Sequence, residues 1–375
     1  MILWAVLMAV LFIAFIGGIF YLIGRLRKFQ WMRKAAGGKK KLEILLGAVI
    51  VIIPAAIIWV AWGQMNAIIC ILHLIVFWAV SDGIFALVKK SRKKEFKRYY
   101  AGITAIVFTI VYLAAGWYGA HHVWEKNYTI ETDKAVGNFR VALLSDSHTG
   151  TTFHGDGFSE HMKEIGKQNP DVVLVAGDFV DDDTTKEDMI RCCQALGEMK
   201  TTYGVYYVFG NHDKGYYPSD YRGYTGDDLI AELEKNGVTV LQDQNVLIDN
   251  RVYIIGRQDR SEDVEKGKGR ADMATLTQDL DDSKFSIVMD HQPADYEAQA
   301  ASGVDLVVSG HTHGGQLFPL MNIENLTGLG GDDKVYGYEK RGNTNFVVTS
   351  GISDWAIKFK TGCRSEYVLI DIQGK

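Results

Sequence analysis

Five short clusters of Asp, His and Asn contain the side chains of this sequence that could do chemistry. They are Asp146-Ser147-His148, Gly177-Asp178, Gly210-Asn211-His212-Asp213, Asp290-His291 and Gly310-His311-Thr312-His313. Carboxylates, imidazoles and one amide oxygen make a mixed nitrogen and oxygen donor set without a thiolate. Such a set favours Mn, Fe, Zn or Co over a soft metal, and the imidazoles argue against a pure Mg or Ca site.

Each cluster follows an apolar run of strand length. The runs span residues 141–144, 172–176, 205–209, 287–289 and 306–308. Segments of helical period lie between them, near residues 158–168, 186–199, 227–236 and 294–301. Buried strands alternating with helices indicate an α/β domain, in which ligands collect beyond the carboxyl ends of the strands. We therefore expect the five clusters to meet at one sheet edge, with further strands at 252–255, 345–349 and 367–372.

The order of these clusters resembles the calcineurin-like metallophosphoesterase superfamily, over roughly residues 128–373. That family's motifs are Asp-x-His, Gly-Asp-x-x-Asp, Gly-Asn-His-Asp/Glu, a lone His and Gly-His-x-His, and all are present. The later Gly314-Gly315-Gln316 and Thr349-Ser350-Gly351-Ile352 resemble its membrane-associated bacterial branch. The resemblance implies a four-layer α/β fold, in which two mixed β-sheets are flanked by helices.

The resemblance also implies a role for each motif residue. One metal would be held by Asp146, His148, Asp178 and His313, and the other by Asp178, Asn211, His291 and His311. His212 would not be a ligand; it would face the phosphate and stabilise or protonate the leaving oxygen, oriented by Asp181. The cofactors would be two divalent metal ions, with manganese, iron, zinc or cobalt as candidates.

The implied activity is hydrolysis of a phosphate ester by a hydroxide that two metal ions activate. The branch includes enzymes that act on lipid-linked or nucleotide-linked phosphodiesters, so a phosphodiester or pyrophosphate of the cell envelope is the expected substrate. Two alternatives stay open: a membrane sensor or transport protein with a phosphate-binding ectodomain, and a protein phosphatase.

Several residues near the motifs have open roles. Asp290 stands where the family usually has an apolar or small residue; it either orients His291 or is solvated. Ser147 and Thr149 are more polar than usual after the first Asp. Whether Arg257 and Asp259 line the substrate cleft is open. The remaining candidates are expected mainly in surface or packing roles: His154, His161, Tyr216, Tyr217, Tyr221 and Tyr224.

Charge divides the chain into two parts. Residues 1–120 carry 15 Lys and Arg against three acidic residues, a net charge of +12, and the other residues carry a net charge of −17. An acidic domain repels polyanions, so we expect no nucleic-acid partner. Four cysteines are too few for a disulfide framework. Whether Cys192, Cys193 and Cys363 form a bridge is open.

The basic part is predicted to be a four-helix transmembrane region over residues 1–120. Apolar runs at residues 1–24, 42–62, 65–88 and 101–120 are each long enough to cross a bilayer. Residues 121–138 are interpreted as a linker and residues 139–375 as the metallophosphoesterase domain. His73 and Asp82 lie within the third run, where a relay role competes with pairing or snorkelling of Asp82.

Loop charge predicts the orientation of this region. Basic residues crowd the segments after the first and third runs, whereas residues 63–66 carry no charge. Because basic loops stay cytoplasmic, we expect a multi-pass protein of the cell membrane with an extracytoplasmic catalytic domain.

Overall fold

The computed structural model describes residues 2–328 and 330–375, with the side chains of residues 12–328 and 330–375. It contains two compact units. The first comprises the residues up to Gly116 together with Ala356–Lys358, and the second comprises Trp117–Trp355 and Phe359–Lys375.

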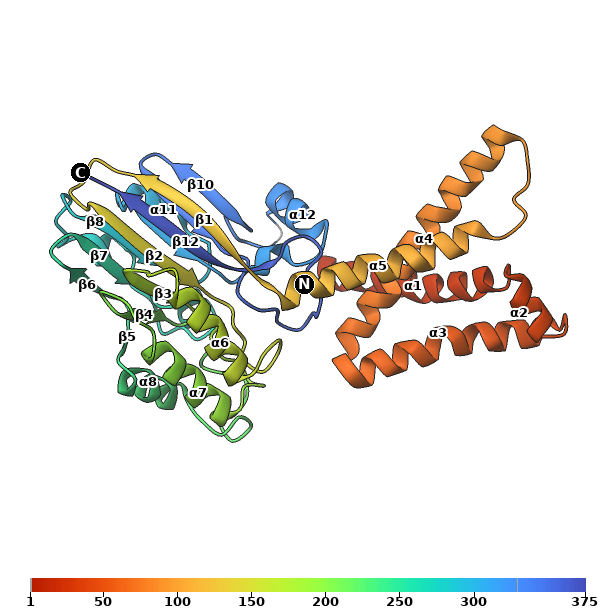
Figure 1. Cartoon of the computed structure of the whole chain (residues 1–375), viewed down its shortest axis with the longest axis horizontal. Coiled ribbons are helices and arrows are strands. Elements are labelled where there is room, and N and C mark those ends of the chain that lie inside the picture. Colours follow the sequence, from red (N-terminus) through yellow and green to blue (C-terminus); the bar gives the residue numbers. More distant parts are fainter. Residues whose placement is uncertain (1, 329) are drawn as a thin grey trace. The chain divides into compact units, whose positions relative to one another are not determined.

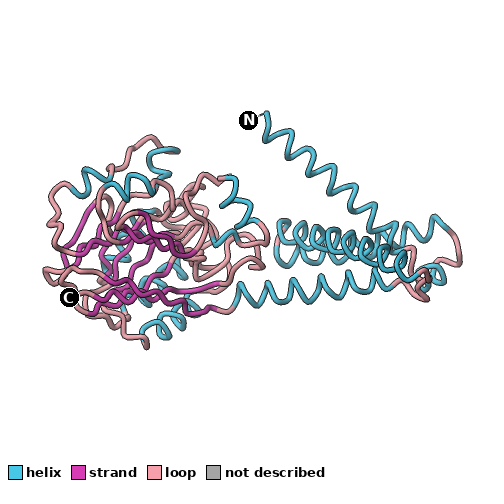
Figure 2. Tube along the Cα trace, turned by 90° about the horizontal axis from the view of Figure 1, so that it is seen from above, coloured by secondary structure: helices cyan, strands magenta, loops and turns pink. Residues whose placement is uncertain are grey.

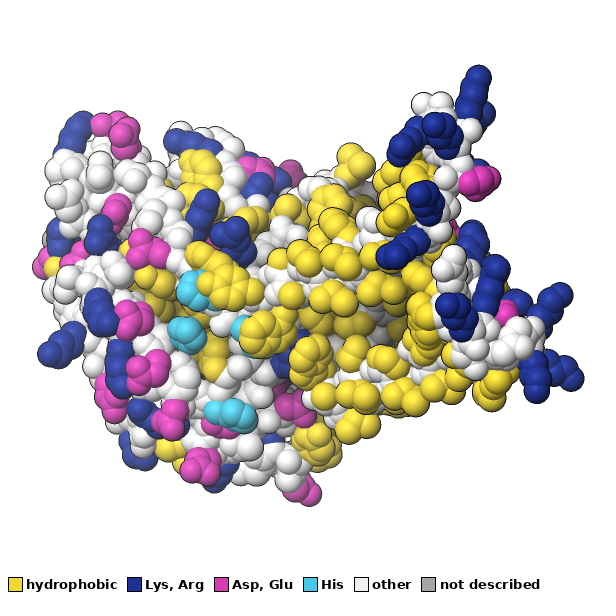
Figure 3. Space-filling model, turned by 45° about the vertical axis from the view of Figure 1, so that its right-hand side comes forward, with side chains coloured by type: hydrophobic (Ala, Val, Ile, Leu, Met, Phe, Trp, Pro, Cys, Tyr) yellow, Lys and Arg dark blue, Asp and Glu magenta, His cyan; other side chains and the backbone are white. Residues whose placement is uncertain are grey.

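The first unit is built of helices joined by short loops (Figure 1). Its helices are α1 (Ile2–Leu26), α2 (Gln30–Ala35), α3 (Lys40–Trp62), α4 (Gln64–Arg92) and the larger part of α5 (Tyr100–His121). By length and composition α3, α4 and α5 can each cross a membrane, and α1 contains a shorter apolar stretch, Phe12–Leu26. Apolar side chains cover these helices, and Lys and Arg gather at one end of them, as Figure 3 shows.

Asp82 is paired inside this unit. Its carboxylate lies 2.8 Å from Arg25 Nε and accepts hydrogen bonds from the hydroxyls of Tyr21 and Tyr99. His73 Nδ1 lies 2.8 Å from the carbonyl oxygen of Ile69, one turn earlier. Both ionisable groups therefore have partners within the helices. For Asp82 this is the pairing that was weighed against a relay role.

Two mixed six-stranded sheets form the centre of the second unit, and its strands are magenta in Figure 2. In spatial order the first sheet contains β1 (Val123–Glu131), β12 (Ser365–Gln373), β2 (Asn138–Leu144), β3 (Val172–Ala176), β4 (Val205–Val208) and β5 (Val238–Val240). The second contains β10 (Gly337–Arg341), β11 (Thr344–Val348), β9 (Leu306–Ser309), β8 (Phe285–Met289), β7 (Val252–Gly256) and β6 (Gln244–Ile248).

Alternate residues of each strand enter different cores. In β2, Leu143 packs between the two sheets, whereas Ala142 and Leu144 face the outer helices. The first sheet is covered by α6 (Gly155–Gly166), α7 (Lys186–Gly197) and α8 (Gly226–Lys235). The second is covered by α10 (Met273–Thr277) and α11 (Tyr296–Ala301). The shorter elements are α9 (Arg260–Val264), a 3₁₀ turn (His313–Gly315) and α12 (Leu320–Thr327). The predicted four-layer fold, preceded by apolar helices, is confirmed.

The stretch 121–138, interpreted from the sequence as a linker with at most a short strand at 128–131, contains the nine-residue strand β1. β1 pairs in parallel with β12 along its whole length, from Val123 opposite Ser365 to Glu131 opposite Gln373. Most β1 side chains are exposed or half-buried, because β1 is the edge strand of its sheet. Its polar sequence therefore lacks the apolar run by which the buried strands were recognised.

Candidate metal centre

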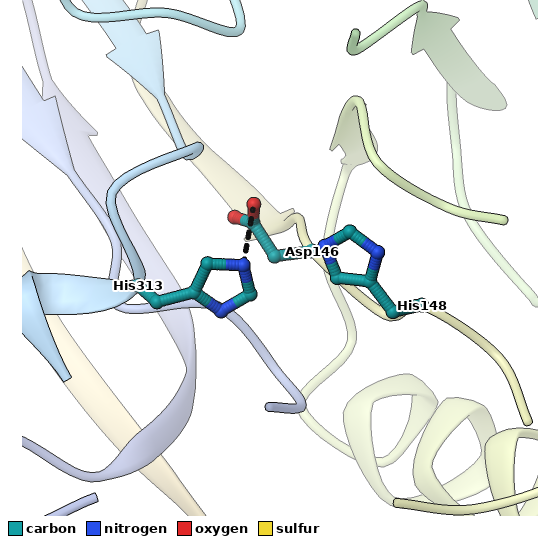
Figure 4. A group of neighbouring side chains, drawn as sticks. All are labelled: Asp146, His148 and His313. Carbon is teal, nitrogen blue, oxygen red and sulfur yellow. Dashed lines mark ion pairs between the residues drawn. The ribbon is translucent and has the colours of Figure 1, made fainter. Parts of the chain in front are cut away.

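The five polar clusters meet beyond the carboxyl ends of β2, β3, β4, β8 and β9. They place two groups of acidic and histidine ligands side by side, Asp146 with His148 and His313, and Asp178 with His291 and His311. Within each group the possible ligand atoms lie within 4.8 Å of one another. Figure 4 shows the first group, in which the His313 ring turns its Nε2 toward Asp146 Oδ1, 3.6 Å away.

Asp178 lies between the two groups. Its Oδ2 is 3.1 Å from His291 Nε2 and 3.6 Å from His148 Nε2. Burial alone would raise the pKa of this carboxyl, but the imidazoles of His291 and His148 hold it well below its usual range. Asp178 is therefore ionised and offers negative charge to both groups.

Several buried ligand atoms here make no hydrogen bond. In the described part of the chain, both ring nitrogens of His148, Nε2 of His291, Nδ1 of His313 and Oδ1 of Asn211 are buried without a hydrogen bond. Buried polar groups nearly always make hydrogen bonds, so several buried nitrogen and oxygen atoms without one, close together, fit a site that binds cations. His291 illustrates this, because its Nδ1 lies 2.7 Å from the carbonyl oxygen of Ala176 and must carry the proton. In the neutral ring its Nε2, which lies 3.1 Å from Asp178 Oδ2, is then the atom that can bind a metal.

The other two histidines of the groups are also suited to ligation. Burial lowers the pKa of His311 to about 4 and that of His313 well below its ordinary value. Both imidazoles are therefore neutral at neutral pH, the form that binds a metal. Asn211 donates from Nδ2 to the hydroxyl of Tyr216 at 2.9 Å, which leaves its Oδ1 free.

The backbone at the strand ends is strained where it presents these side chains. Positive φ angles occur at five of the seven candidate ligands, namely Asp146, His148, Asp178, His311 and His313. Non-glycine residues rarely adopt this region, and it clusters at functional sites. A Cβ on Gly210 would collide with Oδ1 and N of Asp178, and one on Gly310 would collide with Ser145 and Asp146. Glycine is therefore required at both corners.

Asp213 holds the loop that carries Asp178, a role the sequence reasoning missed. Its buried carboxylate accepts from four backbone amides, those of Asp178, Phe179, Val180 and Gly210, at 2.6–3.0 Å. Burial raises its pKa to about 6. The sequence signal for Asp213 was its place at the end of the Gly-Asn-His-Asp motif, but the motif does not indicate which backbone amides it binds.

His212 stands beside the groups with aromatic rings on two sides. Its ring centroid lies 5.1 Å from that of His148, 5.1 Å from Tyr216 and 5.1 Å from Trp355. Burial lowers the pKa of His212. A phosphate anion next to this ring would favour protonation again. Trp355 was not singled out from the sequence.

Asp181 lies beside His148. Among the interactions of the described residues, its Oδ2 lies 3.3 Å from His148 Nδ1. A carboxylate beside one ring nitrogen orients the other nitrogen toward a metal. Asp181 thus fits the orientation of His148, and the reason is local: Asp181 also accepts from the amide of Asp183, which keeps its side chain in its own turn.

Asp290 is neither a partner of the His291 ring nor solvated. It is fully buried and accepts from Arg257 Nη1 at 3.2 Å, Arg270 Nη1 at 3.0 Å and Gln299 Nε2 at 2.9 Å. Arg257 and Arg270 also line a polar pocket of about 560 Å³. Asp259 instead caps α9 and accepts from Gln292.

The remaining open positions divide between surface and core. His154 is exposed and paired with Asp188, His161 packs on Phe153, and Tyr217 and Tyr221 are exposed. Tyr224 is buried. Ser147 and Thr149 both donate to the carbonyl oxygen of Phe179. All four cysteines are free.

Comparison with known proteins agrees with the fold and the donor set. The family model for calcineurin-like phosphoesterase matches residues 139–315. An uncharacterized metallophosphoesterase of Aquifex aeolicus is 30% identical over 196 residues, 52% of this chain and 70% of the relative. One of Campylobacter jejuni is 28% identical over 313 residues, 82% of this chain and 79% of the relative.

The chain belongs to the calcineurin-like phosphoesterase family, whose members are metal-dependent phosphoester hydrolases that generally bind two divalent metals. It is also similar to a transmembrane protein with metallophosphoesterase domain of Bos taurus, 27% identical over 253 residues, 64% of this chain and 54% of the relative. With the apolar helices of the first unit, this similarity identifies a membrane protein.

We predict that Gly210→Ala displaces Asp178 and weakens binding of Mn²⁺ by at least about tenfold, as the loss of outer contacts to ligands does. Calorimetric titration of the purified full-length protein measures this. Gly166→Ala is the matched control, because a Cβ there meets nothing within 4 Å. Unchanged affinity in Gly210→Ala would show that the corner tolerates a side chain.

Proposed function

We propose that this chain hydrolyses phosphate esters at two divalent metal ions that share Asp178. One ion would be held by Asp146, His148, Asp178 and His313, and the other by Asp178, Asn211, His291 and His311. The observation that supports this most directly is the position of Asp178 Oδ2, which lies within 3.6 Å of a histidine from each group. A single carboxylate in that position can bridge two cations.

When bound, such ions would polarise the phosphoryl oxygens and lower the pKa of the attacking water. The protein's part is to fix the ligands. The amide of His311 donates to both oxygens of Asp146, and the amide of His212 donates to Asp178 Oδ1 at 2.9 Å. These bonds hold the two carboxylates at the strand ends while leaving Asp178 Oδ2 directed at the histidines.

His212 is the proposed acid for the leaving oxygen. Among the motif histidines it is the one outside both ligand groups, and it is half-exposed next to them. A bound phosphate would favour its imidazolium form, which can then donate a proton to the departing oxygen. Trp355 and Tyr216 flank the ring and limit its movement.

The proposed substrate is a phosphodiester or pyrophosphate of the cell envelope, lipid-linked or nucleotide-linked. Attachment to apolar helices in the same chain supports a substrate found at a membrane. The donor set of imidazole, carboxylate and amide oxygen supports Mn, Fe, Zn or Co as the metal.

Asp178→Asn and His212→Ala should each lower the turnover of bis-p-nitrophenyl phosphate in Mn²⁺ by at least about 100-fold, because the first removes the bridging charge and the second the acid. Release of nitrophenol by the full-length protein measures turnover, and circular dichroism checks the fold. His154→Ala, an exposed histidine paired with Asp188, should keep the wild-type rate. Wild-type turnover in either site variant would contradict the assignment. Phosphate binding without any turnover in the native protein would favour a sensor.

We further propose four membrane spans, α1, α3, α4 and α5, with the second unit extracytoplasmic. The support is the charge of the connections, since residues 25–41 and 89–98 are rich in Lys and Arg and residues 63–66 are uncharged.

A reporter enzyme fused after Lys375 tests this orientation. Alkaline phosphatase, which is active only outside the cytoplasm, should be active there, and green fluorescent protein exported by the general secretion route should be dark. The reverse pattern would place the second unit in the cytoplasm.

A further inference from the structure

The chain passes from a membrane helix into the catalytic unit with almost no connection. α5 ends at His121 and β1 begins at Val123, so His122 alone separates them. α5 is one of the helices long and apolar enough to cross a bilayer. The first residues of β1 must therefore lie within a few ångströms of the membrane surface, because one residue spans at most about 3.6 Å.

Strand register places the metal-ligand groups at the end of the sheet where β1 begins. β1 runs parallel to β12, with Val123 opposite Ser365. β12 runs antiparallel to β2, with Val368 opposite Leu143. The start of β1 and the end of β2 therefore lie at the same end of the sheet. Asp146 follows β2 by two residues, so the ligands lie at the end of the sheet where α5 continues into β1.

Side-chain contacts join the last turn of α5 to the ligand loops. Ser365 Oγ donates to the carbonyl oxygen of Ala120 at 2.7 Å. Five residues before Ser365, the buried Lys360 donates to the carbonyl oxygen of Ser350 at 2.6 Å. Cys363 donates to the carbonyl oxygen of His313 at 3.0 Å. The segment 360–365 thus lies between the end of the membrane helix and a candidate metal ligand.

The same end of the sheets carries exposed apolar side chains. The segment after His313 is tied down by Gln316, whose carbonyl oxygen accepts from Thr361 and Gly362. α12 follows it and has no buried residue. Phe318 is 59% exposed and Leu326 86% exposed, and Leu320, Ile323 and Trp355 are exposed as well. Figure 1 shows α12 at the end of the sheets from which β1 starts.

We propose that this apolar surface, formed by Phe318, Leu320, Ile323, Leu326 and Trp355, docks on the lipid bilayer and presents the metal centre to the headgroup layer. A bilayer is the occupant that the short connection requires, since the surface lies at the end of the sheets that α5 holds at the membrane. Trp117 and Tyr118, exposed in the last turn of α5, are residues that prefer the same interfacial depth. Exposed apolar side chains of this kind on one face are typical of interfacial helices.

The substrate class follows from this docking and rests on the proposed function. A centre that faces the headgroups meets phosphate groups attached to lipids of its own leaflet before it meets soluble esters. The substrate would then be a lipid headgroup phosphodiester or pyrophosphate, with its apolar part still in the bilayer.

The docking is tested on the full-length protein in nanodiscs of equal parts phosphatidylcholine and phosphatidylglycerol, some carrying a nitroxide on the headgroup. A bimane label is attached to Leu326→Cys or Phe318→Cys, in a background where Cys70 and Cys363 are replaced by Ser. The control label is at Leu247→Cys. Leu247 is also exposed, but it pairs with Tyr253 near the opposite end of its sheet.

The nitroxide should lower the fluorescence at Leu326 and Phe318 by at least about twofold and leave that at Leu247 unchanged, because an interfacial helix lies among the headgroups. No quenching at Leu326 and Phe318, or equal quenching at Leu247, would overturn the docking. Turnover of bis-p-nitrophenyl phosphate is measured on the same samples. Quenching without turnover would refute the proposed function but not the docking. Turnover without quenching would refute the docking but not the proposed function.

Discussion

The buried carboxylate of Asp178 is the charge on which the rest of the site depends. It lies within 3.6 Å of histidines from both ligand groups, and a buried anion of this kind is stable only with positive charge or donors around it. The protein supplies part of that through the amide of His212, and it organises the loop through the four amides that bind Asp213. The remaining demand is for cations, which the orphaned nitrogens of His148 and His291 can bind.

The fold meets this demand by ending its strands at one edge. β2, β3 and β4 are parallel neighbours, and so are β7, β8 and β9 in the other sheet. Their carboxyl ends bring residues up to about 165 positions apart in the chain into contact, as the bond from His311 to Asp146 shows. The backbone strain at five ligands is the local cost of turning the chain sharply there.

The α/β class and the meeting of the polar clusters at one sheet edge could be predicted from the sequence because their signals are local, whereas the four-layer arrangement and the two ligand groups were implied by the family resemblance. Each buried strand is a continuous apolar run, and each ligand directly follows one, as Asp178 follows β3. The features that escaped prediction depend on partners distant in the chain. β1 is recognisable only by its pairing with β12, and Trp355 comes near His212 only through the fold. The partners of Asp290, namely Arg257, Arg270 and Gln299, also escaped prediction, because sequence spacing does not reveal which neighbour a buried carboxylate meets.

If Asp178 is shared between the two ligand groups, the protein must hold two cations. Metal analysis of the full-length protein after dialysis against Mn²⁺ measures that number directly. We expect about two ions per chain in the native protein, since two-metal sites bind both ions in adjacent positions. A content of one ion or fewer at saturating Mn²⁺ would contradict the account.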